Sequence, residues 1–168
     1  MPGLIVETDR GMFCPAGGFY IDPWRTEPGM QAIITHAHSD HLRSGCGSYL
    51  CSPSCAPLVR ARLGASTPLC TQGFGAARAQ RVGDVRVTLY PAGHVLGSAM
   101  IRVERAGGGT GGHEGGVWLV TGDYKLTPDG VSETAEITRC DTLVTESTFG
   151  LPIYRWPAQD VLMDEINA

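Results

Sequence analysis

The sequence lacks an apolar run long enough to span a bilayer, which takes about 20 consecutive apolar residues. Its first residues have no basic cluster and no long apolar stretch, so they do not resemble a secretory signal. Excess positive charge is also missing, since the net charge is −4. A non-specific nucleic-acid binder normally has a basic surface, although bound divalent cations can supply positive charge locally. We therefore expect a cytoplasmic protein that makes no membrane contact.

What the sequence does have is enough apolar material for one core. Its 168 residues are 42% hydrophobic and 18% charged, as in a single globular domain. Short apolar runs separated by turn residues predict strands, and two segments have helical character. The strands are expected at residues 4–8, 18–22, 32–34, 48–51, 81–82, 85–90, 99–105, 117–124 and 142–150, and the helices at 53–63 and from 157 onward. This mixture predicts an α/β protein.

Six cysteines are present, and Cys51 and Cys55 are spaced as a possible metal-binding pair. Without a secretory signal, the thiols of such a chain are expected to be reduced. Ser52 and Pro53 between the pair are typical of a helix start. Because free cysteine is among the most buried residue types, we interpret both as structural.

The densest group of metal-binding residue types is the stretch 35–41, Thr-His-Ala-His-Ser-Asp-His, which follows the apolar run 32–34. Alternation along an extended segment puts His36 and His38 on one side. Asp40 and His41 lie past the bend and can face a second metal. Histidine is the commonest ligand for zinc-like metals, and carboxylates complete such sites. The stretch predicts a metal site at a strand end; an exposed His-rich turn is the alternative.

The pattern His-x-His-x-Asp-His after an apolar strand resembles the signature of the metallo-β-lactamase superfamily. That resemblance implies an αββα sandwich with one or two metals at the sheet edge. His94, within Gly-His-Val-Leu-Gly-Ser, falls where the superfamily places its third His ligand, and Asp123 matches the carboxylate that bridges two metals. Asp22 falls where an Asp supports the metal-binding loop, but a turn-initiating Asp before a proline explains it equally well.

Glu146 opens the segment Glu-Ser-Thr-Phe-Gly, which resembles the first motif of the β-CASP branch of this superfamily. Members of that branch cut DNA or RNA, and ordinary β-lactamases and glyoxalases lack the motif. Residues 13–17, 21–24 and 152–157 resemble the bacterial DNA-ligase-associated exonucleases of the branch. The resemblance covers essentially the whole chain. It implies a DNA exonuclease of DNA repair, with DNA favoured over RNA and with a DNA ligase and a helicase as partners.

The resemblance also implies a ligand set and a mechanism. One zinc would be held by His36, His38 and His94 and the other by Asp40 and His41, with Asp123 as the bridge. Zinc is favoured over magnesium because imidazoles dominate the set. Two metals would generate a hydroxide that attacks the phosphorus of a phosphodiester. Asp40 would orient this nucleophile, and Glu146 would hold a histidine that the chain does not contain.

Members of the branch continue well beyond the equivalent of residue 168. We therefore expect residues 1–150 to be the N-terminal part of a metallo-β-lactamase domain, incomplete at its C-terminus. Residues 151–168 would start the segment leading into a missing β-CASP domain. The second zinc site would be incomplete, and the chain alone would be a poor nuclease. Two alternatives stay open: a small-molecule hydrolase of thioesters or lactams, and a non-catalytic metal-binding fragment.

One region is expected to have no chemical role. Residues 106–116 form a glycine-rich hairpin loop without the strand-to-helix context of a phosphate loop. We expect this loop to be flexible. His113, which lies in it, is left out of the predicted site.

Overall fold

The computed structural model describes residues 3–105 and 116–168, and its strands form two sheets. The first sheet follows sequence order: β1 (Val6–Thr8), β2 (Gly11–Cys14), β3 (Phe19–Ile21), β4 (Gln31–Ile33), β5 (Ser48–Cys51) and β6 (Leu69–Thr71). Strands β1 to β3 are antiparallel, whereas β3 to β6 run parallel. The parallel half needs longer connections, and these connections carry the histidine-rich stretch and the first helix.

The second sheet has the order β11 (Thr142–Val144), β10 (Val117–Val120), β9 (Ala99–Arg105), β8 (Val85–Pro91) and β7 (Gln80–Val82). All neighbouring pairs are antiparallel except β10 and β11. Gly83, at φ 56°, makes the tight turn between β7 and β8, in the gap between the strands that the sequence predicts at 81–82 and 85–90. A left-handed turn of this kind favours glycine, which has no Cβ to clash.

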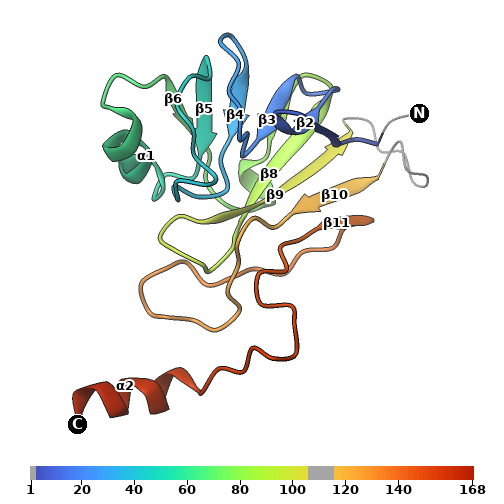
Figure 1. Ribbon diagram of the computed structural model, residues 1–168. Helices are drawn as coiled ribbons and strands as arrows, with labels where there is room; N and C mark the ends of the chain where they lie inside the picture. Colours follow the sequence, from blue (N-terminus) through green and yellow to red (C-terminus); the bar gives the residue numbers. More distant parts are fainter. Residues whose placement is uncertain (1–2, 106–115) are drawn as a thin grey trace.

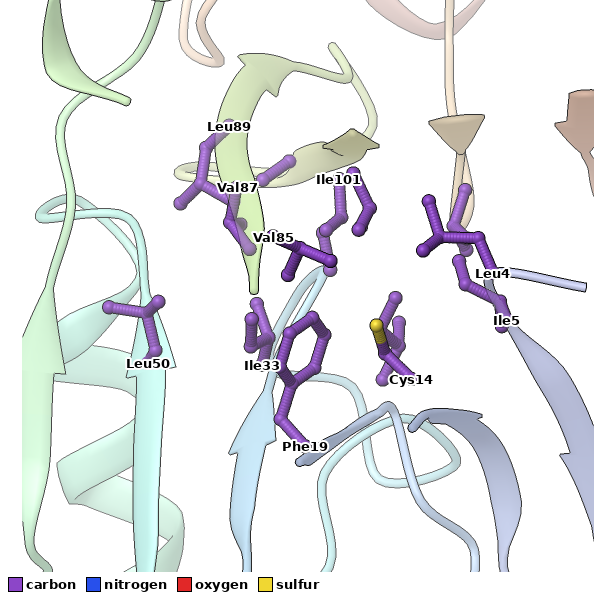
Figure 2. Packing of buried hydrophobic residues seen from close by; sticks show 14 residues of the cluster. Leu4, Ile5, Cys14, Phe19, Ile33, Leu50, Val85, Val87, Leu89 and Ile101 are labelled. Atoms are coloured by element: carbon purple, nitrogen blue, oxygen red, sulfur yellow. The ribbon is translucent and has the colours of Figure 1, made fainter. Parts of the chain in front are cut away.

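The two sheets pack face to face around one apolar core (Figure 1). Val85, Val87 and Leu89 are two residues apart on β8, so they share the face that meets the first sheet. Figure 2 shows them opposite Phe19 and Ile33, which come from β3 and β4. Each of these five side chains is fully buried. Burial of this apolar surface stabilises the sandwich and fixes the ends of its strands relative to one another.

Helix α1 (Ala56–Leu63) covers the outer face of the first sheet. Its Ala56 and Val59 pack against Ala32 and Tyr49 of the sheet. The helix starts later than predicted, because residues 53–55 form a turn before it, and it stops at Gly64 as expected. A short 3₁₀ turn, η1 (Ala76–Arg78), precedes β7, and α2 (Gln159–Asn167) lies away from both sheets (Figure 1). None of the helices in the described residues is long and apolar enough to cross a membrane.

This architecture confirms the expected fold in part. Two packed sheets with few helices are compatible with a metallo-β-lactamase-like sandwich. Within residues 3–105 and 116–168, however, α1 supplies a helical layer on the first sheet, and no helix packs in the same way on the second. The division at residue 150 stays a prediction. The expected glycine-rich loop and His113 fall almost entirely outside the described residues.

Two strands were not predicted from the sequence, β2 and β6. Both are short and lie next to turns, so they offer too few residues for an alternating pattern to be seen. They are strands because a neighbouring strand supplies backbone partners: β2 pairs with β1 and β3, and β6 pairs with β5. Strands β10 and β11 are shorter than predicted, so Asp123 and Glu146 lie in the loops that follow them.

We predict that Ile101→Ala, in the centre of the core between the sheets, lowers the free energy of unfolding by about 2–5 kcal/mol, because it leaves a cavity among fully buried neighbours. Ile137→Ala is the matched control, since Ile137 is 76% exposed, and should change stability by no more than about 0.5 kcal/mol. Urea unfolding followed by circular dichroism measures both. Equal losses would mean that the two sheets do not pack as described.

Candidate metal centre

Four side chains from three separate loops converge at one edge of the sandwich. His36 and His38 follow β4 of the first sheet, His94 lies between β8 and β9, and Asp123 follows β10. Their candidate ligand atoms all lie within 4.8 Å of one another. The structure therefore brings together three of the histidines and one of the carboxylates predicted from the sequence.

The distances between the imidazole nitrogens fit a shared metal. His38 Nδ1 lies 3.0 Å from His36 Nε2 and 3.3 Å from His94 Nε2. Zinc–nitrogen bonds of about 2.0–2.1 Å at tetrahedral angles would separate two ligand nitrogens by about 3.3 Å. Asp123 Oδ2 lies 3.6 Å from His94 Nε2 and 3.9 Å from His36 Nε2. The donor set of three imidazoles and a carboxylate is one that zinc accepts.

Asp123 also contacts another predicted ligand, His41, which in turn lies near Asp40. Asp123 Oδ1 is 3.4 Å from His41 Nε2, and Asp40 Oδ2 is 3.7 Å from the same nitrogen. Thus one oxygen of Asp123 faces the three-histidine group and the other faces His41. A carboxylate in this arrangement can contribute to two neighbouring metal sites. The Asp40 side chain is 73% exposed, so this second half is open to solvent.

A buried carboxylate, Asp22, holds the histidine loop from behind. It accepts hydrogen bonds from the Thr35 N–H at 2.8 Å and from the Thr35 hydroxyl, and it contacts His41 Nδ1 at 2.8 Å. These bonds support the interpretation of Asp22 as the residue that supports the metal-binding loop. Its backbone has φ 42°, which is unusual for a residue other than glycine. Gly122 packs against Thr35 so closely that a Cβ would lie 2.6 Å from the Thr35 Cβ.

The same contacts select the histidine tautomers. The Thr35 hydroxyl donates to Asp22, so its oxygen can accept a hydrogen bond from a protonated His36 Nδ1, 3.1 Å away. His41 Nδ1–H can donate to Asp22 directly. In both rings this leaves the Nε2 lone pair on the side of Asp123. Partners of this kind orient ligand imidazoles and raise their basicity in metal sites.

Protonation also favours ligation in the three-histidine half. Burial, together with repulsion from His41, His38 and His94, lowers the pKa of His36 to about 3. Burial also lowers the pKa of His94, even though Asp123 opposes the shift. Both rings are therefore neutral near pH 7, the state that a metal requires. For His41, burial would lower the pKa, but the hydrogen bond to Asp22 and the negative charges of Asp22, Asp123 and Asp40 together outweigh it and raise the pKa.

Glu146 lies next to this group without joining it. Its carboxylate accepts a hydrogen bond from the Tyr124 N–H at 3.1 Å. Burial would raise the pKa of Glu146, yet hydrogen bonds from Thr148 and Tyr124 outweigh it and lower the pKa. A cavity of about 230 Å³ separates Glu146 from His41 and is also lined by Trp24. Asp40 and Asp123 also line this cavity, so it is shared by Glu146 and the open half of the site.

The alternative metal pair, Cys51 and Cys55, lies elsewhere. Both thiols are fully buried, and both pack in the cluster beneath α1 with Val59. A hydrogen bond with Cys55 and burial raise the pKa of Cys51. In the part of the chain that the structure describes, they belong to no cluster able to hold a metal. Their surroundings support the structural interpretation.

Sequence reasoning missed two residues that hold the site, Thr35 and Ser98. Ser98 Oγ accepts hydrogen bonds from the N–H groups of His94, at 3.0 Å, and of Val95, at 3.2 Å. A Ser or Thr close to a ligand histidine is a usable sequence signal, because its hydroxyl can bond to nearby backbone groups. Its target, however, cannot be identified before the loop conformation is known.

The comparisons with known proteins point to nucleic-acid enzymes. No family model matches the chain. A protein of Opitutus terrae named "Probable DNA ligase" is 34% identical over 161 residues, which cover 96% of this chain and 15% of that protein. "Endoribonuclease YSH1" of Gibberella zeae is 36% identical over 52% of the chain, and "Transcription termination factor FttA" of Pyrococcus abyssi is 42% identical over 40% of it. Each of those two matches covers 10% of the relative.

These relatives confirm the resemblance stated from the sequence. The chain is a relative of the β-CASP nucleases of the metallo-β-lactamase superfamily. It spans about a seventh or less of the length of these curated relatives. A solved structure titled as a protein of unknown function from Enterococcus faecalis V583 covers 58% of the chain, and the chain covers 25% of that protein, at 15% identity and a TM-score of 0.42. So weak a structural similarity defines neither fold nor function.

We predict that Asp22→Asn lowers the pKa of His41, because the substitution removes the negative charge that stabilises its imidazolium. An NMR titration of the histidine side chains in metal-free protein measures the shift. Asp9→Asn is the control, because the Asp9 carboxylate is 75% exposed and contacts Arg25 rather than a histidine. An unchanged His41 pKa in the Asp22 variant would contradict the hydrogen bond seen here.

We also predict that the double variant Cys51→Ala, Cys55→Ala keeps the metal content of the unsubstituted protein, because neither thiol belongs to the histidine cluster. The loss of packing under α1 should instead lower the melting temperature. Elemental analysis after dialysis and a thermal melt distinguish the two effects. A loss of metal without a loss of stability would show that the cysteine pair is a ligand pair.

Proposed function

We propose that this chain carries a zinc centre of a nucleic-acid phosphodiesterase, most specifically of a DNA exonuclease that acts in DNA repair. The main observation behind this proposal is that three imidazole nitrogens, from loops of two different sheets, converge at the spacing expected of zinc ligands. The similarity to β-CASP nucleases supports hydrolysis of nucleic acid. Because the chain spans a small part of those relatives, the activity of the whole protein is part of the proposal.

In this proposal the ligands form two groups that would bind zinc with different affinities. A first zinc would be held by His36, His38, His94 and Asp123, and a second, weaker one by Asp40, His41 and the other oxygen of Asp123. Zinc would supply a Lewis acid and would make hydroxide available near neutral pH. The neutral state of His36 and His94 favours the first group. The raised pKa of His41 and the exposure of Asp40 weaken the second.

The protein's own residues would then orient the reaction. Asp40, exposed beside His41, would orient the nucleophile and receive its proton. Asp123 would hold the two halves of the site in register, since each of its oxygens faces one half. Glu146 would fix a further group that enters the cavity between it and His41; in the sequence-based proposal this is a histidine from outside the chain.

We propose DNA as the substrate because the relative with a DNA-related name matches more of the chain than the relative with an RNA-related name. The relative named as a DNA ligase matches 96% of the chain, whereas the one named as an endoribonuclease matches 52%. The ligase match also supports a ligation system as the partner, because the similar stretch lies within a protein of that name. A helicase partner and a cytoplasmic location rest on the resemblance alone. We further propose that residues 151–168 lead toward a β-CASP domain.

We predict that the chain binds one zinc tightly and that His38→Ala abolishes this binding, because His38 Nδ1 is the nitrogen that both other imidazoles face. His113→Ala is the matched control, since no part of the proposed site includes it. Elemental analysis after dialysis decides the matter. Two tightly held zincs, none, or equal losses in both variants would count against this ligand set.

We predict weak chelator-sensitive release of nucleotides from labelled linear DNA by this chain, and loss of most of that release in Asp123→Asn, because the substitution affects both halves of the site. The same preparation should be tested on RNA, a lactam and a thioester. Preference for a lactam or thioester would favour the small-molecule hydrolase. Zinc binding without hydrolysis of any substrate would favour the non-catalytic fragment.

A further inference from the structure

The loop that carries His94 is tied to a distant carboxylate, Glu133. Glu133 Oε2 accepts a hydrogen bond from the Gly97 N–H at 2.8 Å, and Oε1 accepts one from the Ser54 hydroxyl at 2.5 Å. Gly97 belongs to the loop between β8 and β9 of the second sheet, whereas Ser54 precedes α1 on the first. The Glu133 side chain therefore links the loop that carries His94 to the segment that precedes α1.

The Gly97 peptide is held on its other side as well. Its carbonyl accepts a hydrogen bond from Ser52 Oγ at 2.6 Å. Gly97 has φ 74°, and a Cβ at this position would lie 2.2 Å from the Cys55 nitrogen. Glycine is required here by both the conformation and the close approach. Gly97 is thus held by hydrogen bonds to both its N–H and its carbonyl.

This anchor is connected to His94 through few bonds. Ser98 follows Gly97 directly, and its hydroxyl accepts the N–H of His94. The Ser98 N–H in turn bonds to the Val95 carbonyl at 2.9 Å, which closes the loop on itself. A displacement of Gly97 therefore moves the hydroxyl that positions the His94 backbone, and with it the imidazole that faces His38.

The charge on Glu133 suits this task. Burial would raise its pKa, but the hydrogen bonds from Ser54 and Gly97 outweigh burial and lower the pKa. The side chain is ionised near neutral pH, and an ionised acceptor forms stronger hydrogen bonds than a neutral one. Neighbouring segments add backbone bonds of the same kind, from the Lys125 N–H to the Ala92 carbonyl and from the Glu136 N–H to the Pro91 carbonyl. The bond to Glu133 differs from these backbone bonds because a carboxylate side chain makes it, so a substitution can remove it.

We propose that Glu133 is a positioning residue of the metal centre: through the Gly97 peptide it sets where His94 meets His36 and His38. This inference rests on the proposed zinc site, and it adds a residue that lies in none of the recognised motifs. Substitution of groups that orient metal ligands commonly weakens metal affinity about 10–100-fold. The effect should require His94, since, of the two residues that donate side-chain-directed hydrogen bonds to Glu133 in the described part of the chain, only Gly97 lies in a loop that carries a proposed ligand.

The test measures zinc affinity by chelator competition in the 168-residue protein. Glu133→Ala should weaken zinc binding about 10–100-fold, and Ser54→Ala, which removes one of the two hydrogen bonds to the carboxylate, should weaken it less. Glu136→Ala is the matched control, because Glu136 lies three residues away with an exposed side chain and enters the network through its backbone N–H. It should leave the affinity unchanged.

A double-mutant cycle separates positioning from general stability. In a His94→Ala background, which retains His36, His38 and Asp123, the added Glu133→Ala change should have no further effect on zinc affinity. An NMR spectrum of metal-free protein gives an independent readout, since the Gly97 amide should lose the downfield shift that a bond to a carboxylate produces. If Glu133→Ala does not fold, Glu133→Gln replaces it in both measurements.

The failures can be told apart. An unsubstituted protein that binds no zinc overturns the proposed metal centre and this inference with it. If that protein binds zinc but Glu133→Ala binds it equally well, only the inference is overturned. The same holds if the substitution weakens binding equally with and without His94, or if it lowers the melting temperature without changing zinc affinity.

Discussion

Three imidazole nitrogens with converging lone pairs impose the main constraint on this molecule. His38 Nδ1 lies close to both His36 Nε2 and His94 Nε2, and the contacts behind His36 place its proton on the opposite ring nitrogen. Lone pairs at such distances repel one another unless a cation lies between them. Burial lowers the pKa of His36 and of His94, so proton uptake by these two rings is a poor way to relieve the repulsion. The arrangement is suited to a metal.

Such an arrangement has to be held by the surrounding structure, because free side chains would turn away from one another. Each ligand loop is held by hydrogen bonds with polar groups that are not themselves proposed ligands. Asp22 and Thr35 hold the histidine loop after β4, and Ser98 and Glu133 hold the loop before β9. The Thr35 carbonyl also accepts the N–H of Ala99 at 2.8 Å, so the histidine loop is bonded directly to the first residue of β9. These hydrogen bonds together keep the ligand side chains in place.

The loops can meet only because the sheets that carry them are packed together. Val87 and Ile101 on one side and Ile33 and Phe19 on the other fill the space between the sheets and leave no room for sliding. The half of the site that contains Asp40 and His41 is more open to solvent than the three-histidine half. Asp40 is exposed there, and a cavity separates His41 from Glu146. The closed half is suited to retaining a metal, whereas the open half has the access that a substrate needs.

Much of this could be predicted from the sequence, because some of its signals are local. The strands predicted at 81–82 and 85–90 and the end of the helix predicted at residue 63 depend on neighbouring residues alone, and the structure agrees with them. The spacing of His36, His38 and His41 after an apolar run is equally local, and it was enough to predict a metal site and to suggest the superfamily.

The remaining features depend on contacts between segments that are far apart in the chain. Strands β2 and β6 exist because other strands supply their hydrogen-bond partners, which no short stretch of sequence reveals. The hydrogen bonds of Asp22 to Thr35 and the bond from Gly97 to Glu133 join residues far apart in the chain. A side chain's own sequence neighbourhood specifies what it can bond to. The packing of the two sheets determines which of those partners it meets.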